Sequence, residues 1–186
     1  LSYTTFTQKM SNIKDDGTSL SFDVTVTNTG SVTGKDVVEV YYNPPYTNGG
    51  IEKASANLIA FEKTGLLEPG ASETITVTFD KEEMASYDMS GTGCYVLEKG
   101  DYVISINSDS HNILDSKTYT QNSDIRYDAD NKRDSDAAVA VNQFGDAAGD
   151  ITYLSRADGF ANLTEATAAP SDTNMAEKYV EGYHLN

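Results

Sequence analysis

The sequence is short of the residues that cross-link small proteins or carry them into membranes. Cys94 is the only cysteine among 186 residues, so the chain can form neither an internal disulfide nor a cluster of thiolate metal ligands. We expect Cys94 to be a small, buried apolar residue. No run approaches the roughly 18 apolar residues of a membrane-spanning helix, and no signal segment is recognisable. The composition therefore argues against a membrane partner and against a metal centre built on cysteine.

Positive charge is scarce as well. The chain has 13 Lys and Arg residues against 29 Asp and Glu, which gives a formal net charge of -16 at pH 7. Proteins that bind phosphate backbones need clustered basic side chains to displace counterions, so this composition argues against nucleic acid as a partner. Apolar residues make up 38% of the chain, which is low for one compact globule. We therefore expect one domain with an appendage, or two small domains.

The clearest pattern lies between residues 20 and 42. Apolar residues occupy every second position in two stretches, which is the period of a strand with one buried and one exposed face. These residues are Leu20, Phe22, Val24 and Val26, followed by Val38, Val40 and Tyr42. Between them, Asn28, Thr29, Gly30 and Gly34 are expected to allow left-handed backbone angles and to turn the chain. Two such strands need a second layer to cover their apolar faces.

Further strand patterns follow at sandwich-like spacing. We expect a single helical turn at 81–87, and Tyr102 follows Gly100 and Asp101 as in the tyrosine corner of immunoglobulin-like domains. A run at 58–63 is expected to cross between sheets. The remaining strand patterns lie at 1–13, 72–79, 95–97, 102–106 and 115–121. The sequence therefore predicts an all-β, antiparallel, immunoglobulin-like sandwich of about seven strands.

The character of the sequence changes after Asn122. Charged residues crowd 128–136, and apolar residues beyond it are too sparse to close a second core. We predict a sandwich at 1–121 and a largely irregular connecting arm at 122–186, with two turns of helix at 175–183. The arm is expected to lie on a partner or to remain mobile, so proteases should cut the isolated chain soon after Asn122. We also expect the chain to be a piece of a larger protein.

Several short motifs occur together in a fixed order. They are Leu1-Ser2-Tyr3-Thr4-Thr5-Phe6, Val24 to Gly30, Gly34 to Val38, Tyr42 to Tyr46, Ala60 to Lys63, Leu67 to Gly70, Tyr87-Asp88 and Leu97 to Tyr102. Together they resemble the fibronectin type III-like domain of family 3 glycoside hydrolases, the beta-glucosidase and beta-xylosidase family. The resemblance implies a fibronectin type III-like β-sandwich that works beside catalytic domains. Cys94-Tyr95 departs from the family pattern, which has a Trp there.

The resemblance also implies an activity for a parent enzyme. Retaining hydrolysis of β-glycosides uses two carboxyl groups about 5 to 5.5 Å apart, which in this family come from a barrel and an α/β domain. These domains are the partners that the resemblance implies. The family nucleophile lies in Ser-Asp-Trp, but no Ser-Asp pair here precedes Trp, so no catalytic residue is carried over and no cofactor is implied. Residues 149–158 resemble the connector of members in which the barrel follows the fibronectin-like domain, which implies a permuted domain order.

Four residues are candidates for contact with sugar. Tyr41 and Tyr46 lie on either side of Pro44-Pro45 and offer rings on which a pyranose face could stack, although packing within the loop is the alternative. Arg156 and Asp158 lie in the connector. In the assembled parent they would reach a sugar hydroxyl, or they would form a structural ion pair.

The histidines and the acidic run do not indicate a catalytic or metal-binding site. His111 and His184 are far apart in polar stretches, so we expect exposed histidines and not a catalytic triad or a metal site. The acidic residues of 128–136 are spaced like a calcium loop. Lys132 and Arg133, however, replace residues that the EF-hand template requires, so we expect a solvated linker.

The sequence therefore favours a noncatalytic accessory part of a family 3 glycoside hydrolase, which braces the catalytic domains. A carbohydrate-binding module that binds oligosaccharide and a general interaction sandwich are the alternatives. The bracing role predicts exposed apolar patches on the isolated piece. Sugar specificity and oligomeric state are left open. The compartment is also open, with the cytoplasm favoured by the lack of disulfides.

Overall fold

The computed structural model describes residues 3–147, 149–169 and 174. The chain divides into two compact units, residues 1–149 and 150–186, and each is described by itself. The strands of the first unit are β1 (Phe6–Met10), β2 (Lys14–Asp15), β3 (Ser19–Asn28), β4 (Val37–Asn43), β5 (Asn57–Lys63), β6 (Ser72–Asp80), β7 (Ser86–Tyr87), β8 (Tyr95–Leu97), β9 (Gly100–Asn107), β10 (Ile113–Gln121) and β11 (Ile125–Tyr127). Two 3-10 turns, η1 (Lys81–Met84) and η2 (Gly145–Ala147), complete it, and the second unit holds the short helix α1 (Leu163–Ala166).

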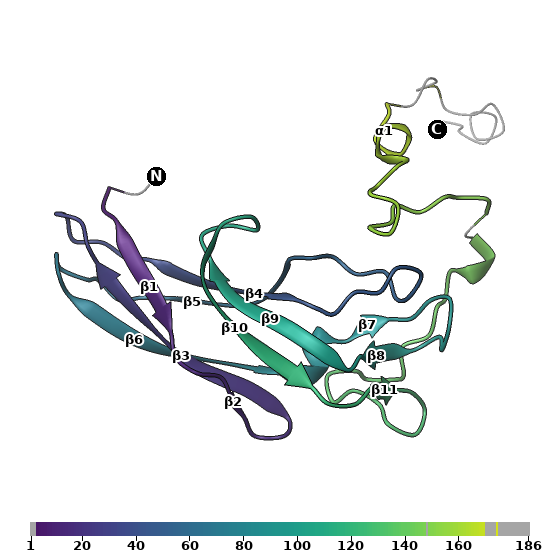
Figure 1. Cartoon of the computed structure of the whole chain (residues 1–186), viewed down its shortest axis with the longest axis horizontal. Helices are drawn as coiled ribbons and strands as arrows, with labels where there is room; N and C mark the ends of the chain where they lie inside the picture. The colour runs from purple at the N-terminus through teal and green to yellow at the C-terminus, as the bar shows by residue number, and fades with distance from the viewer. Residues whose placement is uncertain (1–2, 148, 170–173, 175–186) are drawn as a thin grey trace, which may run out of the picture. The chain divides into compact units, whose positions relative to one another are not determined.

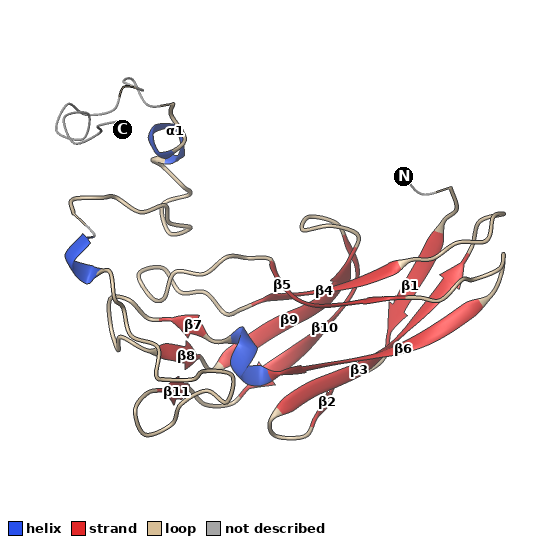
Figure 2. Ribbon diagram, turned by 180° about the vertical axis from the view of Figure 1, so that it is seen from behind, coloured by secondary structure: helices blue, strands red, loops and turns tan. Residues whose placement is uncertain are grey.

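Two antiparallel sheets of four strands form a sandwich (Figure 1). In the first sheet β3 pairs with β6 along one edge and with β1 and β2 along the other. The second sheet has the order β10-β9-β4-β5. A small third sheet, β11-β8-β7, lies at one end of the sandwich (Figure 2). The predicted all-β sandwich is confirmed, but the expectation that 58–63 crosses between sheets is wrong, because β5 is the edge strand of the second sheet.

The core confirms the predicted alternation of apolar residues. On β3 and β4 the buried apolar residues are Leu20, Phe22, Val24, Val26, Val38, Val40 and Tyr42. They pack against Val77 and Phe79 of β6 and against Tyr102, Ile104 and Ile106 of β9. Burying one such side chain stabilises a fold by about 1.5–3 kcal/mol, so this shared interior holds the two sheets together.

The predicted tyrosine corner is present at the start of β9. Tyr102 is 1% exposed, and its hydroxyl donates a hydrogen bond to the Glu98 carbonyl at 3.1 Å. Gly100 has a φ of 135°, a backbone angle that favours glycine. Burial raises the pKa of the Tyr102 hydroxyl, which therefore stays protonated and keeps its role as a donor.

The turn after β3 is stabilised differently from the prediction. Asn28 is fully buried. Its Oδ1 accepts bonds from Thr4 Oγ1 at 2.8 Å and the Gly30 N–H at 3.0 Å, and its Nδ2 donates to the carbonyls of Val32 and Leu67, both at 2.8 Å. Gly30 is not in the left-handed region. Instead, a Cβ there would lie 2.1 Å from Thr4 Oγ1, so the N-terminal segment passes too close for any side chain.

The compact first unit extends past Gln121, where we expected the sandwich to end. β11 pairs with β8 in the register Ile125 to Leu97, and the unit runs to Gly149. The second unit contains a turn at 155–160 and α1, which lies at its surface. The helix expected at 175–183 lies outside the described residues. Within the part of the chain that is described, no helix combines the length and apolar character needed to cross a membrane.

Candidate interaction surfaces

The edge strand β5 presents an apolar strip to solvent. Phe61 is 69% exposed and Leu58 is 52% exposed. The strand register places them beside Glu39 and Tyr41 of β4, so both point from the same face of the second sheet. Leu66, shortly after β5, is 70% exposed. Large apolar side chains gathered at a free sheet edge are typical of a contact surface, and the sequence analysis expected such a patch.

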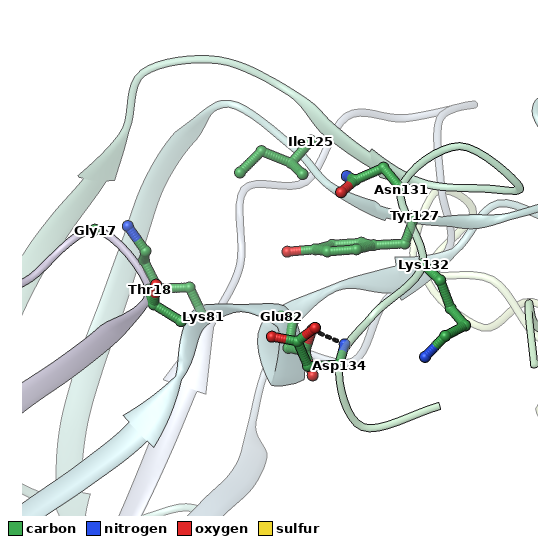
Figure 3. Close-up of a pocket in the computed structure, with 9 residues that line it drawn as sticks. All are labelled: Gly17, Thr18, Lys81, Glu82, Ile125, Tyr127, Asn131, Lys132 and Asp134. Atoms are coloured by element: carbon green, nitrogen blue, oxygen red, sulfur yellow. Dashed lines mark hydrogen bonds between the residues drawn. The ribbon is translucent and has the colours of Figure 1, made fainter. Parts of the chain in front are cut away.

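The charge run after β11 is fixed to the sandwich by Glu82 of η1 (Figure 3). The Glu82 carboxylate accepts the backbone N–H of Asp134 at 2.7 Å and that of Ser135 at 2.9 Å. Partial burial raises the Glu82 pKa, but these two N–H groups lower it, and the net pKa is lowered. The carboxylate is therefore charged at neutral pH, which strengthens both bonds.

Arg133 holds the same segment against the third sheet. Its guanidinium lies 3.7 Å from the centre of the Tyr95 ring, close enough for a cation–π interaction. It also forms two hydrogen bonds of 2.8 Å to the Asp136 carboxylate. Tyr87 packs edge-on against Tyr95 with ring centres 5.3 Å apart. The acidic segment is thus irregular in backbone and mostly exposed, as expected, but it is attached to the sandwich and is not a free linker.

A pocket of about 220 Å³ lies where this segment meets the sandwich (Figure 3). Tyr127 points its hydroxyl into the pocket, and burial together with the nearby Glu82 raises the pKa of Tyr127 to about 12. Lys81 pairs with Asp15 at 2.9 Å, and Lys132 donates to backbone carbonyls of its own segment. Both lysines of the pocket therefore already have partners within the chain. We interpret the pocket as the junction between the segment and the sandwich and not as a ligand site.

The two candidate sugar-stacking tyrosines are each engaged with a carboxylate. Tyr41 is half-buried on β4 and donates its hydroxyl to Glu39 at 3.1 Å. Burial, followed by this hydrogen bond, raises the Tyr41 pKa. Tyr46 is half-buried in the loop after β4 and donates to Glu52 at 3.1 Å. The structure therefore places the two rings on different elements, a strand and a loop.

Arg156 and Asp158 belong to the second unit, whereas the two tyrosines belong to the first. The Arg156 carbonyl accepts the Gly159 N–H at 3.2 Å, and Asp158 Oδ1 accepts the Ala161 N–H at 3.2 Å. Both residues therefore shape the turn at 155–160.

The remaining candidate residues fit their expected roles where the structure describes them. Cys94 is 5% exposed, as predicted, and its thiol donates to Thr92 at 3.3 Å. His111 lies in an exposed loop, where its backbone N–H bonds to Asp109, and His184 lies outside the described residues. Among the described residues no group of three or more His, Cys, Asp or Glu side chains could hold a metal ion.

One anchoring residue escaped the sequence analysis. Lys53 is only 7% exposed, and it forms an ion pair with Glu98 and donates to the Pro45 carbonyl at 2.7 Å. It fastens the long loop between β4 and β5 to the turn that precedes β9. No local pattern marks this lysine, because its ion-pair partner Glu98 comes from a distant part of the chain.

Comparison with known proteins gives one consistent result. Residues 36–110 match the fibronectin type III-like domain family. The chain is 38% identical over 128 residues to a beta-glucosidase from Ruminococcus albus, which covers 66% of this chain and 13% of that protein. Among solved structures, beta-glucosidase 3B from Thermotoga neapolitana, in complex with glucose, aligns with a TM-score of 0.61 at 35% identity over 68% of this chain and 17% of that one. A beta-glucosidase from Kluyveromyces marxianus, also in complex with glucose, aligns with a TM-score of 0.63 at 28% identity, covering 68% of this chain and 15% of that one.

The chain therefore spans only a small share of the beta-glucosidases that it matches. The described topology, the matched residues and these relatives agree with one another, and the expected resemblance is confirmed. The sandwich is a fibronectin type III-like domain of the kind found in family 3 glycoside hydrolases.

Proposed function

We propose that this chain is a noncatalytic accessory part of a family 3 beta-glucosidase and that it braces the catalytic domains of that enzyme. The observation that carries the proposal is the exposed apolar strip of Leu58, Phe61 and Leu66, which lies on a domain whose relatives are much longer beta-glucosidases. The barrel and α/β domain of the same parent chain are the partners in this proposal. The parent would hydrolyse β-glucosides or β-xylosides, and this part would keep its catalytic domains in place.

Covering the exposed strip would stabilise a contact with the catalytic domains. Burying the exposed parts of its three side chains would contribute on the order of 3–6 kcal/mol. Association of two free proteins would consume much of that gain through lost translation and rotation. Domains of a single chain avoid most of this cost, because the covalent link keeps them at a high effective concentration.

The second unit supports the same role. Ile151, Tyr153 and Phe160 are 63%, 56% and 46% exposed, so this segment carries apolar side chains that the described residues do not cover. In the proposed parent this segment leads from the fibronectin-like domain toward a following barrel and packs on its surface.

A chimera tests the bracing role. The first unit of this chain, residues 1–149, would replace the region of the Ruminococcus albus beta-glucosidase that it matches, and Tm and turnover of a β-glucoside would be measured. We expect the chimera to be active, and Phe61→Asp to lower its Tm by several degrees while the Tm of the isolated chain stays unchanged. Thr78→Asp is the matched control, because it adds the same charge at an exposed position of the first sheet. Equal effects of the two substitutions would contradict the proposal.

Direct contact with sugar is a second candidate function, proposed at Tyr41, Tyr46, Arg156 and Asp158. The exposed loop tip that follows Tyr46 favours it, because residues 47–50 lie open to solvent. Replacing Tyr46 by Ala should then raise the KM of the chimera for oligosaccharides without lowering its Tm. An unchanged KM would remove this candidate.

A further inference from the structure

The largest groove among those described in the first unit includes neither candidate tyrosine in its lining, although Tyr41 donates to the groove residue Glu39. Its volume is about 620 Å³, within the range of sites that hold small molecules. It runs from Phe6 and Gln8 of β1 to the paired ends of β4 and β9, where Glu39 lies opposite Asn107. The groove therefore lies on strands of both sheets, which fix the position of its walls.

Two amide side chains of this groove have hydrogen-bonding capacity that the described residues do not use. Gln8 Nε2 donates to Asp36 Oδ2 and to the Val37 carbonyl, both at 2.9 Å. These two acceptors fix the orientation of the amide, and its Oε1 is buried with no partner in the described chain. Asn107 is only 2% exposed, and its Oδ1 is likewise buried without a described partner.

Two buried acceptors without partners destabilise the fold unless a bound molecule supplies hydrogen-bond donors to them. Buried polar atoms are nearly always paired, and an unpaired acceptor destabilises a fold more than a made hydrogen bond stabilises it. Gln8 also breaks the apolar pattern of β1, since it lies between Phe6 and the buried Met10 at alternate positions. A polar residue at a core-facing position that leaves one buried acceptor unpaired is typical of a binding site.

The other lining groups restrict the chemistry of a ligand. The lining holds two lysines, Lys35 and Lys63, and two carboxylates, Asp36 and Glu39, so its formal charges balance and a strongly charged ligand gains little. Phe6 adds an apolar surface. The best match is a neutral molecule that carries many hydroxyl donors and also has C–H faces, which describes a saccharide.

We propose that this groove binds a short neutral saccharide, whose hydroxyl groups donate to Gln8 Oε1 and to Asn107 Oδ1 after a small rotation of each amide. The torsion that turns an amide of this kind is broad, and the rotation is limited to one that keeps the Gln8 Nε2 bonds to Asp36 and the Val37 carbonyl in place. This site does not include the candidate tyrosines themselves, although Tyr41 is bonded to its lining residue Glu39. It does not depend on the proposed bracing role, because it needs only the isolated first unit.

Amide-resolved NMR on the whole chain tests the proposal. Glucose, cellobiose and xylobiose would be titrated to millimolar concentrations, with a capped, uncharged tripeptide as the competing ligand class. We expect saturable shifts of the side-chain amide signals of Gln8 and Asn107 with sugar. Shifts confined to residues 41–50, or shifts with the peptide alone, would overturn the assignment. No shifts at all would mean that water satisfies these groups, which would overturn it as well.

Substitutions provide an independent check. Gln8→Met keeps the length of the side chain but removes its acceptor, so the affinity for sugar should fall about tenfold. Gln121→Met is the matched control, because Gln121 is also buried but its amide is fully engaged with Tyr119 and the Ser123 carbonyl. The control should lose stability and keep its affinity for sugar. If Gln8→Met binds sugar as tightly as the original chain, the proposal is wrong.

Discussion

The acidic segment 128–136 should resist trypsin in the isolated chain, although its sequence suggests an exposed linker. Arg133 lies 3.7 Å from the Tyr95 ring and forms two hydrogen bonds to Asp136, while Glu82 holds the backbone of the next two residues. The bond after Lys132 is therefore closed to a protease unless the segment detaches. Cleavage should begin in the second unit, after Arg156, and not soon after Asn122.

Arg133→Ala measures how firmly the segment is held. The substitution removes a partly buried cation–π contact, worth about 0.5–2 kcal/mol, and an ion pair worth about 0–1 kcal/mol. Only the segment is released, because the sandwich core does not include Arg133. A loss of about 1–2 kcal/mol raises the population of the open segment by about 5- to 30-fold. Since cleavage follows that population when opening is fast, trypsin should cut after Lys132 faster by the same factor.

Mass spectrometry of timed digests gives the rate at each site. Arg126→Ala serves as the control, because it removes an equal charge from an exposed position of β11 and should leave the rate after Lys132 unchanged. If the original chain is cut after Lys132 as fast as after Arg156, the described attachment is wrong. Equal rates in the Arg133→Ala and Arg126→Ala variants would also refute the reasoning.

Further predictions concern stability, measured by urea unfolding. Tyr102→Phe should lower the free energy of unfolding by about 1–2 kcal/mol, because it removes the tyrosine-corner hydrogen bond. Asn28→Ala should cost about 2–4 kcal/mol, since several buried groups lose their partner at once. The lowered Glu82 pKa means that Glu82 stabilises the fold above its unfolded pKa of about 4.3, and this contribution is lost as pH falls through the folded pKa; Glu82→Gln should reduce the acid sensitivity. The Tyr127 pKa of about 12 predicts a loss of stability as pH rises above about 10, which Tyr127→Phe should weaken.

Local patterns allowed most of the sandwich to be predicted. Leu20 and Val26 mark the ends of an alternation that needs no information beyond a few neighbouring residues, and both are fully buried. The long-range contacts that hold the loops and the segment 128–136 in place could not be predicted in this way. Asn28 bonds to a residue 39 positions away, Lys53 pairs with Glu98 of a distant turn, and Arg133 contacts a strand that precedes it by dozens of residues. Such contacts leave no periodic signal in the sequence.

For the same reason, an exposed apolar patch could be predicted from the sequence, but its position could not. The bracing hypothesis required exposed apolar groups, but the run at 58–63 could be read as a buried crossing segment. Only the pairing of β5 with β4 alone shows that one edge of β5 is free. Phe61 and Leu58 then project from the sheet without cover from the described part of the chain.

Hydrogen exchange along β5 tests the bracing role most directly. Amide exchange of residues 57–66 would be compared between the isolated chain and the chimera with the Ruminococcus albus enzyme. The account predicts strong additional protection of these residues in the chimera, and loss of that protection in its Phe61→Asp variant. Equal exchange in the isolated chain and in an active chimera would show that the catalytic domains do not cover β5, and would contradict the account.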